Sequence, residues 1–294
     1  MRASQISDRT TGTGDDGRRR WRVQPGQQER NPRAFARRRR LERRLLGVLV
    51  PVVLLVAWEL CANAGLIDTR FFPAPSQIGS TAVDMIGNGI LLTDLTVTVR
   101  VLLIGLVSGF VVGTVAGLLL GLSRIARAAL EPLLSALYTI PKLAVLPLLL
   151  LIFGVGELPK VILVGLGVFF IAWISVLEAI LDLPGAYGEA ATAFDVRGWR
   201  RMRHVTLPAV LPQVLVGLRI SVGNAVLIVV GVEFVSGDEG IGYRIWNSWS
   251  IFAADRMYVG IVVVALLGYL LSLLVQLLSR VCVPWAPSTA ARRD

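Results

Sequence analysis

The stretch Thr96–Leu122 reads TVTVRVLLIGLVSGFVVGTVAGLLLGL, and Arg100 is its only charged residue. A helix needs about 20 mostly apolar residues to cross a bilayer, so this stretch predicts a transmembrane helix. Glycine recurs at every fourth position: Gly105, Gly109, Gly113, Gly117 and Gly121. This spacing places the glycines on one helix face, where they allow another helix to approach closely. That second helix belongs either to the same chain or to a second copy of it.

Five further apolar stretches flank this one, and together they predict six transmembrane helices. They cover residues 45–64, 133–153, 159–181, 209–235 and 258–279. Pro141 and Pro147 interrupt the second of these, which is tolerated where neighbouring helices or a cavity satisfy the freed carbonyl groups. Hydrophobic residues make up 54% of the chain and charged residues 17%, against about 45–50% and about 25% in soluble domains. The sequence therefore predicts an all-α integral membrane protein.

The net charge of +10 follows the predicted topology and does not indicate nucleic-acid binding. Most of the arginine excess precedes Leu45, and other arginines follow the second, fourth and sixth stretches. Cytoplasmic loops are enriched in Lys and Arg, so a multi-pass protein of the plasma or inner membrane with both termini in the cytoplasm is predicted. We expect residues 1–40 to form a disordered Arg-rich cytoplasmic tail, 41–285 the transmembrane domain and 286–294 a C-terminal cytoplasmic tail.

The segment 71–89 is predicted to lie along the outer surface. It begins Phe-Phe-Pro-Ala-Pro-Ser-Gln, in which the prolines disfavour helix and Ser76 is expected to cap a short helix. The predicted topology puts Cys61 and Cys282 on opposite membrane faces, so we expect no disulfide between them. The cysteines and the single histidine show no metal-binding spacing.

The loop 182–208 reads DLPGAYGEAATAFDVRGWRRMRHVTLP and is the most informative part of the sequence for function. Its two early glycines are expected to break the fourth span, and Glu189 to open a short helix whose N-terminus suits a negative charge. A second amphipathic stretch carries Trp199, Met202 and Val205 on one face, and Pro208 starts the fifth span. His204 is expected to be exposed. Two short helices outside the membrane can dock into a groove on a partner protein.

This loop resembles the EAA loop of the permease subunits of ABC importers. The resemblance rests on Glu189-Ala190-Ala191, on the turn residue Asp195, and on Leu207-Pro208. Matches to the nitrate, sulfonate and taurine branch of these permeases lie at residues 72–76, 140–148, 153–156 and 240–243. Asp195 stands where the family usually has glycine. Asp tolerates a left-handed turn better than most residues, and Gly198 is the alternative site of the bend.

The resemblance implies a type I permease of six transmembrane helices with a cytoplasmic coupling loop. The chain has no Gly-x-x-x-x-Gly-Lys-Ser/Thr loop, so we expect it to be no enzyme and to bind no cofactor, with ATP on a separate ATPase subunit. Glu189 would anchor that subunit, Ala190 and Ala191 would keep the contact close, and Leu207 and Pro208 would fix the loop to the fifth span. A periplasmic or lipid-anchored binding protein, a second and identical permease chain, and membrane lipid complete the implied partners.

The same branch implies import of a small anionic solute such as a sulfonate, nitrate or taurine. A pyrimidine precursor, bicarbonate or an aromatic acid is an alternative cargo within the class. An ion-coupled secondary transporter or channel would show ionisable residues in mid-membrane and internal repeats, and neither is evident. A membrane enzyme would need a cluster of His, Asp or Cys near one membrane face, which one histidine makes improbable.

Polar residues inside spans are functional candidates by default. Arg100, Ser221, Asn224 and Glu233 are the candidates for the translocation path, and Arg100 would suit an anionic solute. The alternative is that these residues lie at the interface, pair within the helix bundle or extend to the membrane surface.

Overall fold

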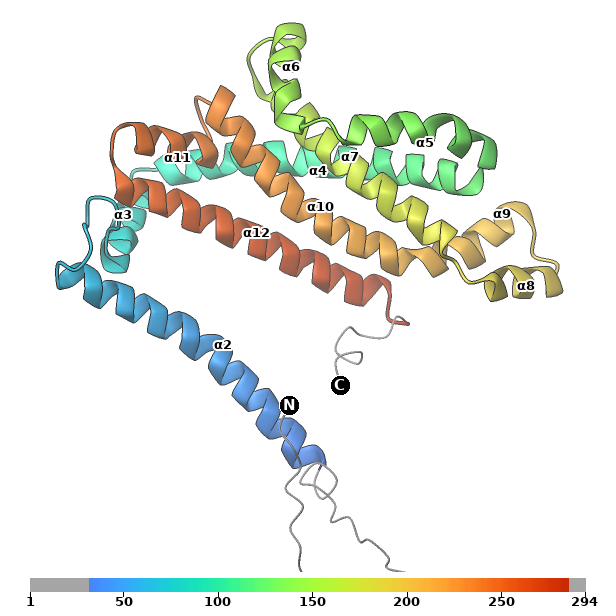
Figure 1. Cartoon of the computed structure of the whole chain (residues 1–294), viewed down its shortest axis with the longest axis horizontal. Coiled ribbons are helices and arrows are strands. Elements are labelled where there is room, and N and C mark those ends of the chain that lie inside the picture. The colour runs from blue at the N-terminus through green and yellow to red at the C-terminus, as the bar shows by residue number, and fades with distance from the viewer. Residues whose placement is uncertain (1–31, 286–294) are drawn as a thin grey trace, which may run out of the picture. The chain divides into compact units, whose positions relative to one another are not determined.

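The computed structural model describes residues 32–285, and their regular elements are all helices (Figure 1). The chain divides into two units, residues 1–57 and 58–294, and the described part of the first unit is residues 32–57 of α2. In chain order the elements are α2 (Pro32–Asn63), α3 (Pro75–Gly87), α4 (Ile90–Leu122), α5 (Arg124–Tyr138), the 3-10 turn η1 (Lys142–Val145), α6 (Leu146–Phe153), α7 (Glu157–Leu181), α8 (Gly185–Ala193), α9 (Gly198–Arg201), the π turn η2 (Met202–Thr206), α10 (Leu207–Ser236), α11 (Ile241–Ser250) and α12 (Ala254–Cys282).

Five of the described helices are long and apolar enough to cross a membrane, and the number is six if one bent pair is counted as a single span. The bent pair is α5 with η1 and α6, which meet at an angle of 91°. The prediction of one helix over 133–153 was therefore wrong in two ways. The helix starts earlier, at Arg124, where Ser123 caps it by accepting a hydrogen bond from the Ala126 N–H. It then ends before Pro141, because proline disfavours helical backbone in the residue that precedes it.

The tail predicted for residues 1–40 extends too far, because α2 already begins at Pro32. Residues 1–31 and 286–294, which include the rest of this tail and the predicted C-terminal tail, lie outside the described residues. The expected helix after Ser76 is α3, but Ser76 does not cap it. Its backbone N–H and hydroxyl both donate to the carboxylate of Glu59, at 3.0 and 2.7 Å, and α3 begins one residue earlier at Pro75.

The glycine stripe of α4 packs against α7 of the same chain (Figure 1). A Cβ atom built on Gly109 would lie 2.2 Å from the carbonyl oxygen of Gly165. One built on Gly113 would lie 2.4 Å from the carbonyl oxygen of Phe169. No side chain fits at such distances, so backbone touches backbone along this contact. The prediction of close helix packing is confirmed, and the second-copy alternative is wrong for this stripe.

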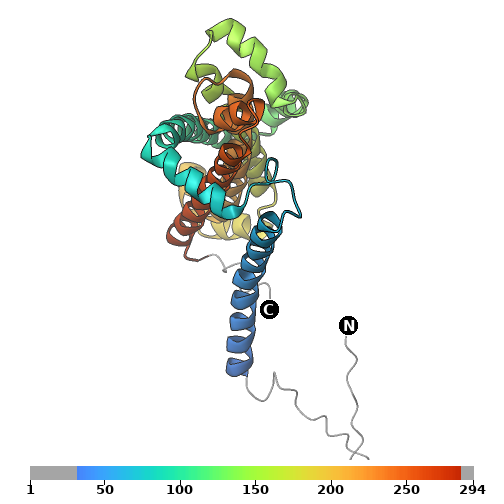
Figure 2. The same cartoon turned by 90° about the vertical axis from the view of Figure 1, so that its left-hand side faces the viewer.

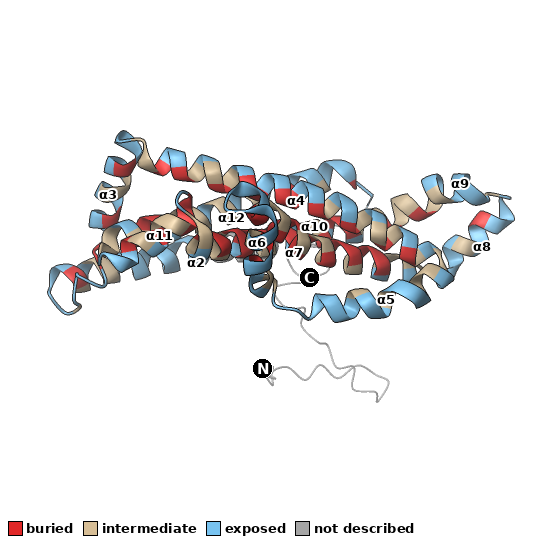
Figure 3. Ribbon diagram, turned by 90° about the horizontal axis from the view of Figure 1, so that it is seen from above, coloured by how far each residue is buried: buried red, intermediate tan, exposed pale blue. Residues whose placement is uncertain are grey.

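The main core forms where α4, α7 and α10 meet, and buried residues follow these three helices (Figure 3). Gly167 of α7 faces Ile228 of α10, where an added Cβ would lie 2.1 Å from the Ile228 Cδ1 atom. The α7 helix therefore contacts α4 through one face and α10 through another. Members of this core include Leu102, Leu163, Val164, Val168, Val222 and Val229.

Two acidic residues at one end of the helices are buried and hydrogen-bonded. Glu233 of α10 has no exposed surface and accepts from the Thr98 hydroxyl at 2.8 Å and from the Gly242 N–H at 2.7 Å. The Thr98 oxygen in turn accepts from the Ile241 N–H at 2.9 Å. The carboxylate thus lies at the N-terminus of α11, where the free N–H groups and the helix dipole favour a negative charge.

A second carboxylate holds the same helix end. Asp94 of α4 accepts from the Gly240 N–H at 3.1 Å and forms an ion pair with Arg244 at 2.6 Å. Gly240 has a φ of +113°, and a Cβ atom there would lie 2.5 Å from the Cδ atom of Glu233. The Gly-Ile-Gly-Tyr sequence at 240–243 is therefore explained by the close approach of α11 to two buried carboxylates.

The second unit has two chemically different ends. One end is formed by the helices α8 and α9, the junction of α4 with α5, and the C-terminal end of α12 (Figure 1). The other end is formed by α3 and α11. At the latter end α3 lies across α4 and α12 (Figure 2), with Ile78, Met85, Leu91, Ile241 and Val259 in a shared apolar cluster. The first end carries the basic loops that the sequence assigned to the cytoplasm, so the fold is consistent with one basic face.

The glycine contact predicts that Gly109→Ala destabilises the fold by about 3 kcal/mol, because the new methyl group overpacks a backbone contact. The measurement is the thermal unfolding midpoint of the purified protein in detergent. The matched control is Gly223→Ala in α10, where nothing lies within 4 Å of the added Cβ and the midpoint should not fall. Equal midpoints for the two variants would contradict the proposed contact.

The buried network predicts that Thr98→Val destabilises the fold by about 2 kcal/mol, because the Ile241 N–H and the Glu233 carboxylate each lose a partner. Thr96→Val, two residues earlier on the same helix, is the control, since Thr96 is exposed and bonds only the Thr93 carbonyl group. Unfolding midpoints of both variants in detergent test this, and a similar loss in both would rule out a special role for Thr98.

Candidate functional site: the α8–α9 projection

The segment between α7 and α10 forms two short helices, as the sequence predicted. The first of them, α8, starts at Gly185 with Pro184 before it, so Gly185 and Gly188 lie inside the helix. The expectation that Glu189 opens this helix was therefore wrong, and Glu189 lies in its second turn. The physical reason is Pro184, whose φ of −55° is already near the helical value and allows the helix to begin at once.

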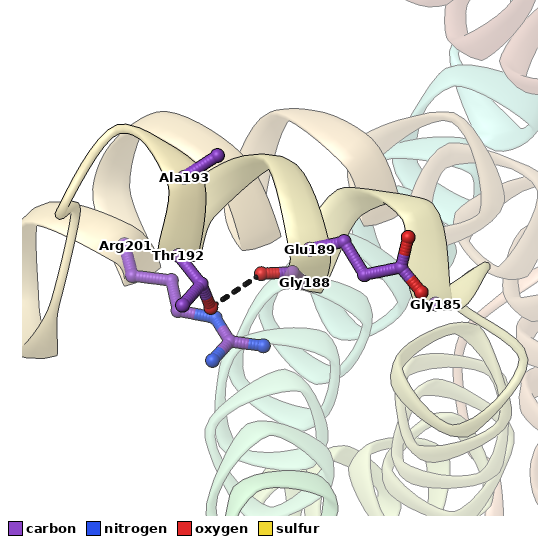
Figure 4. A pocket seen from close by; sticks show the side chains of 6 residues that line it. All are labelled: Gly185, Gly188, Glu189, Thr192, Ala193 and Arg201. Atoms are coloured by element: carbon purple, nitrogen blue, oxygen red, sulfur yellow. Dashed lines mark hydrogen bonds between the residues drawn. The ribbon is translucent and has the colours of Figure 1, made fainter.

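The Glu189 side chain lies on an open hollow of about 610 Å³ (Figure 4). Its carboxylate points toward Gly185, away from the Arg201 guanidinium group on the other side of Gly188 (Figure 4). The Thr192 hydroxyl donates to the Gly188 carbonyl group at 2.9 Å and keeps the helix regular here. The hollow is lined by Gly185, Gly188, Glu189, Thr192, Ala193 and Arg201. An exposed carboxylate beside a cationic surface is thus available to a partner.

The two alanines of the motif have different environments. Ala190 is exposed, whereas Ala191 is 3% exposed and packs within its own chain. The Ala191 carbonyl group also accepts from the Val196 N–H at 2.8 Å, which closes the turn after α8. The contact role implied for both alanines therefore suits Ala190 alone, and Ala191 supports the turn.

The turn between α8 and α9 uses two left-handed residues. Asp195 has a φ of +51° and Gly198 a φ of +55°. The Asp195 carboxylate also contacts the Arg197 guanidinium group at 2.7 Å, and both side chains are largely exposed. Both residues that the sequence offered as alternative sites of the bend are therefore left-handed.

The projection presents large apolar side chains to its surroundings. Phe194 is 82% and Trp199 72% exposed, and Tyr187 is also exposed. The predicted apolar face is therefore divided, because Met202 and Val205 are half-buried while Trp199 points outward. The exposed basic residues of the projection are Arg197, Arg200, Arg201, Arg203 and His204, the last as predicted.

The projection is joined to α10 without a flexible linker. The π turn η2 follows α9 directly and passes into α10 at Leu207, and the backbone keeps helical angles at Arg201, Thr206 and Leu207. Pro208 lies in the first turn of α10, where its missing N–H costs nothing. A displacement of the projection is therefore expected to move α10 with it.

The four candidates for the translocation path do not share one surface. Arg100 is exposed and forms an ion pair with Glu157 at 3.4 Å. Glu233 and Ser221 are fully buried, and the Ser221 hydroxyl has no partner among the described residues. Asn224 is half-buried and faces α7, where a Cβ atom on Gly167 would lie 3.1 Å from its Nδ2 atom.

Two further charged residues lie inside spans and were not among the sequence candidates. Lys160 of α7 is 3% exposed, and Arg219 of α10 is exposed in the middle of its helix. A search for any charged residue within the stretches 159–181 and 209–235 would have found both. The sequence disfavoured an ion-coupled transporter partly because no ionisable residue in mid-membrane was evident. Arg219 is such a residue, so that argument no longer holds.

Comparisons with known proteins identify the family of the chain. Residues 79–284 match the family described as "Binding-protein-dependent transport system inner membrane component". The chain is 31% identical to the putative aliphatic sulfonates transport permease protein SsuC of Bacillus subtilis, over 82% of this chain and 88% of that protein. It is 32% identical to SsuC of Escherichia coli over 81% and 91%, and 29% identical to the taurine transport system permease protein TauC of the same species over 82% and 89%.

The fold is also found in a solved transporter. A chain from the inward-facing MetNI methionine ABC transporter superposes with a TM-score of 0.57 at 23% identity, covering 66% of this chain and 96% of that one. This likeness shows the fold, and the family match and the relatives extend over the α8–α9 projection and most of the helices described above. The chain belongs to the family of binding-protein-dependent transport system inner membrane components, the multi-pass permeases of ABC importers.

Proposed function

We propose that this permease imports a small organic anion of the sulfonate type, with taurine and aliphatic sulfonates as the leading candidates. The names of its relatives in Bacillus subtilis and Escherichia coli support this solute class. A separate ATPase subunit hydrolyses ATP, and this chain provides the membrane passage. The α8–α9 projection, which joins two spans and is continuous with α10, is the observation that carries the mechanism.

In the proposed mechanism the ATPase subunit holds the projection in a groove. Glu189 supplies the charged contact, and Phe194 and Trp199 supply the apolar contact. Closure of the ATPase dimer on ATP displaces α8, and the rigid passage through η2 transmits this displacement to α10. Because α10 packs against α7, and α7 against α4, the displacement changes the arrangement of all three spans together.

The distribution of arginines supports an orientation for this permease. The end with α8, α9 and the basic loops faces the cytoplasm, and the arginines before Leu45 favour a cytoplasmic N-terminus. A periplasmic or lipid-anchored binding protein delivers solute to the end formed by α3 and α11. Two identical permease chains, surrounded by lipid, form the passage between them.

Charge reversal at Glu189 tests the docking site. Glu189→Arg should abolish co-purification with the ATPase subunit, because a cation would replace the proposed anionic contact. Glu239→Arg is the matched control, since Glu239 is an exposed glutamate next to α11 at the opposite end of the fold. Affinity pull-down of the ATPase and solute-stimulated ATP hydrolysis are the measurements.

A wild-type level of ATPase capture by Glu189→Arg, with full coupled ATP hydrolysis, would overturn the docking assignment. A loss in both variants would mean that charge reversal disturbs the protein in general. Capture by the control alone is the expected result.

The left-handed turn gives a second test. Asp195→Gly should preserve coupling, whereas Asp195→Val should weaken it, because a β-branched residue at a φ of +51° costs about 1–2 kcal/mol more than glycine. The measurement is the amount of solute imported per ATP hydrolysed in proteoliposomes. If Asp195→Val coupled as well as Asp195→Gly, the conformation of this turn would have no part in coupling.

A further inference from the structure

Arg219 is a charged residue near the middle of a transmembrane helix. At 1.5 Å per residue it lies roughly 18 Å along α10 from Leu207 and roughly 25 Å from Ser236. Arginine side chains near the ends of a span extend to the headgroup region, but a guanidinium group at this depth does not reach either surface. Its surroundings at mid-span must therefore satisfy its charge.

No group in the described part of the chain satisfies the charge of Arg219. Arg219 has no hydrogen bond and no ion pair there, although its side chain is exposed. By contrast, Arg100 of α4 pairs with Glu157, and Arg244 of α11 pairs with Asp94. The single chain leaves the Arg219 charge uncompensated.

The α10 face that carries Arg219 is open along its length. Val216 is 48%, Ile220 56% and Leu227 75% exposed, and nothing lies within 4 Å of a Cβ atom built on Gly223. These residues recur at helical spacing and form one stripe with Arg219. The opposite face packs on α7, where Gly217 meets Ser175 and Ile228 meets Gly167. Only the stripe is therefore free to face something other than this chain.

A guanidinium group at this depth does not face lipid tails, since charged residues in spans face protein or a water-filled cavity. A water-filled route lined by aliphatic side chains with one cation favours anions, as cationic side chains do in anion-conducting pores. We propose that this α10 stripe lines the translocation path and that the Arg219 guanidinium group binds the oxyanion head group of the solute in transit. This deepens the proposed function and rests on it.

The same comparison ranks Arg219 above Arg100. The charge of Arg100 is already balanced by Glu157, whereas that of Arg219 is not. A guanidinium group also matches a sulfonate or carboxylate with two parallel hydrogen bonds, which a lysine ammonium group does not. Arg219 is thus the principal solute contact, in place of the Arg100 suggested by sequence.

Cysteine labelling tests whether position 219 faces water. Cys61 and Cys282 are first replaced by serine, and Arg219→Cys and Ser221→Cys are made in that background. Ser221 is the matched control because it lies at the same depth but is fully buried. In membrane vesicles the anionic, membrane-impermeant reagent sulfonatoethyl methanethiosulfonate should modify Cys at 219 and leave Cys at 221 unmodified. If both stay unmodified, the stripe faces lipid or packed protein and the proposal is overturned.

Transport then tests the anion contact, with the permease reconstituted in liposomes with its ATPase and binding protein and labelled taurine as probe. Arg219→Gln should lower the taurine import rate at least about tenfold, the loss expected for even one hydrogen bond to a charged group. Arg219→Lys keeps the charge but loses the two parallel hydrogen bonds, so its import rate should lie between those of Arg219→Gln and the wild type. The amount of bound ATPase and the unfolding midpoint should stay at wild-type values in both variants.

Wild-type import by Arg219→Gln would overturn the solute contact, as would an equal fall in unfolding midpoint for both variants, which indicates a structural role. Failure of the wild type to import any taurine with ATP present would instead count against the proposed function. The labelling result is independent of ATP and of the ATPase, so the two failures are distinguishable.

Discussion

The structure depends on the backbone contact between α4 and α7. In a bilayer, lipid tails solvate apolar side chains as well as other helices do, so association rests on close van der Waals packing. Gly109 and Gly113 bring the two helices to backbone contact over Gly165 and Phe169. The other face of α7 receives α10, where Gly167 leaves room for the Ile228 side chain. This three-helix core positions both the polar end and the α8–α9 projection.

Ionisable residues in the spans separate into two classes by whether their charge is satisfied. Glu233 and Asp94 are buried, hydrogen-bonded and engaged with the N-terminus of α11, so they organise the fold. Arg219 is exposed at mid-span and has no partner in the described chain. The position of a residue along its predicted span does not distinguish these classes, whereas its hydrogen bonds in the folded structure do.

The two proposals are connected by one helix. α10 starts directly from the projection that carries Glu189, bears Arg219 near its middle, and carries the buried Glu233 in its last turn. A displacement that enters at the cytoplasmic projection therefore passes the proposed solute contact before it reaches the opposite end. A helix that is packed along one face and open along the other can transmit this displacement while it lines a path.

The sequence by itself determined the membrane class and the five long spans, because hydrophobic length acts within short stretches of chain. It also located the glycine stripe and the projection. Only the tertiary structure decided that Gly109 packs on the same chain, that Glu233 holds α11 and that Pro141 bends the third span by 91°. These outcomes depend on which groups distant in sequence meet, and a buried charge or a helix break is stable only when such partners are present.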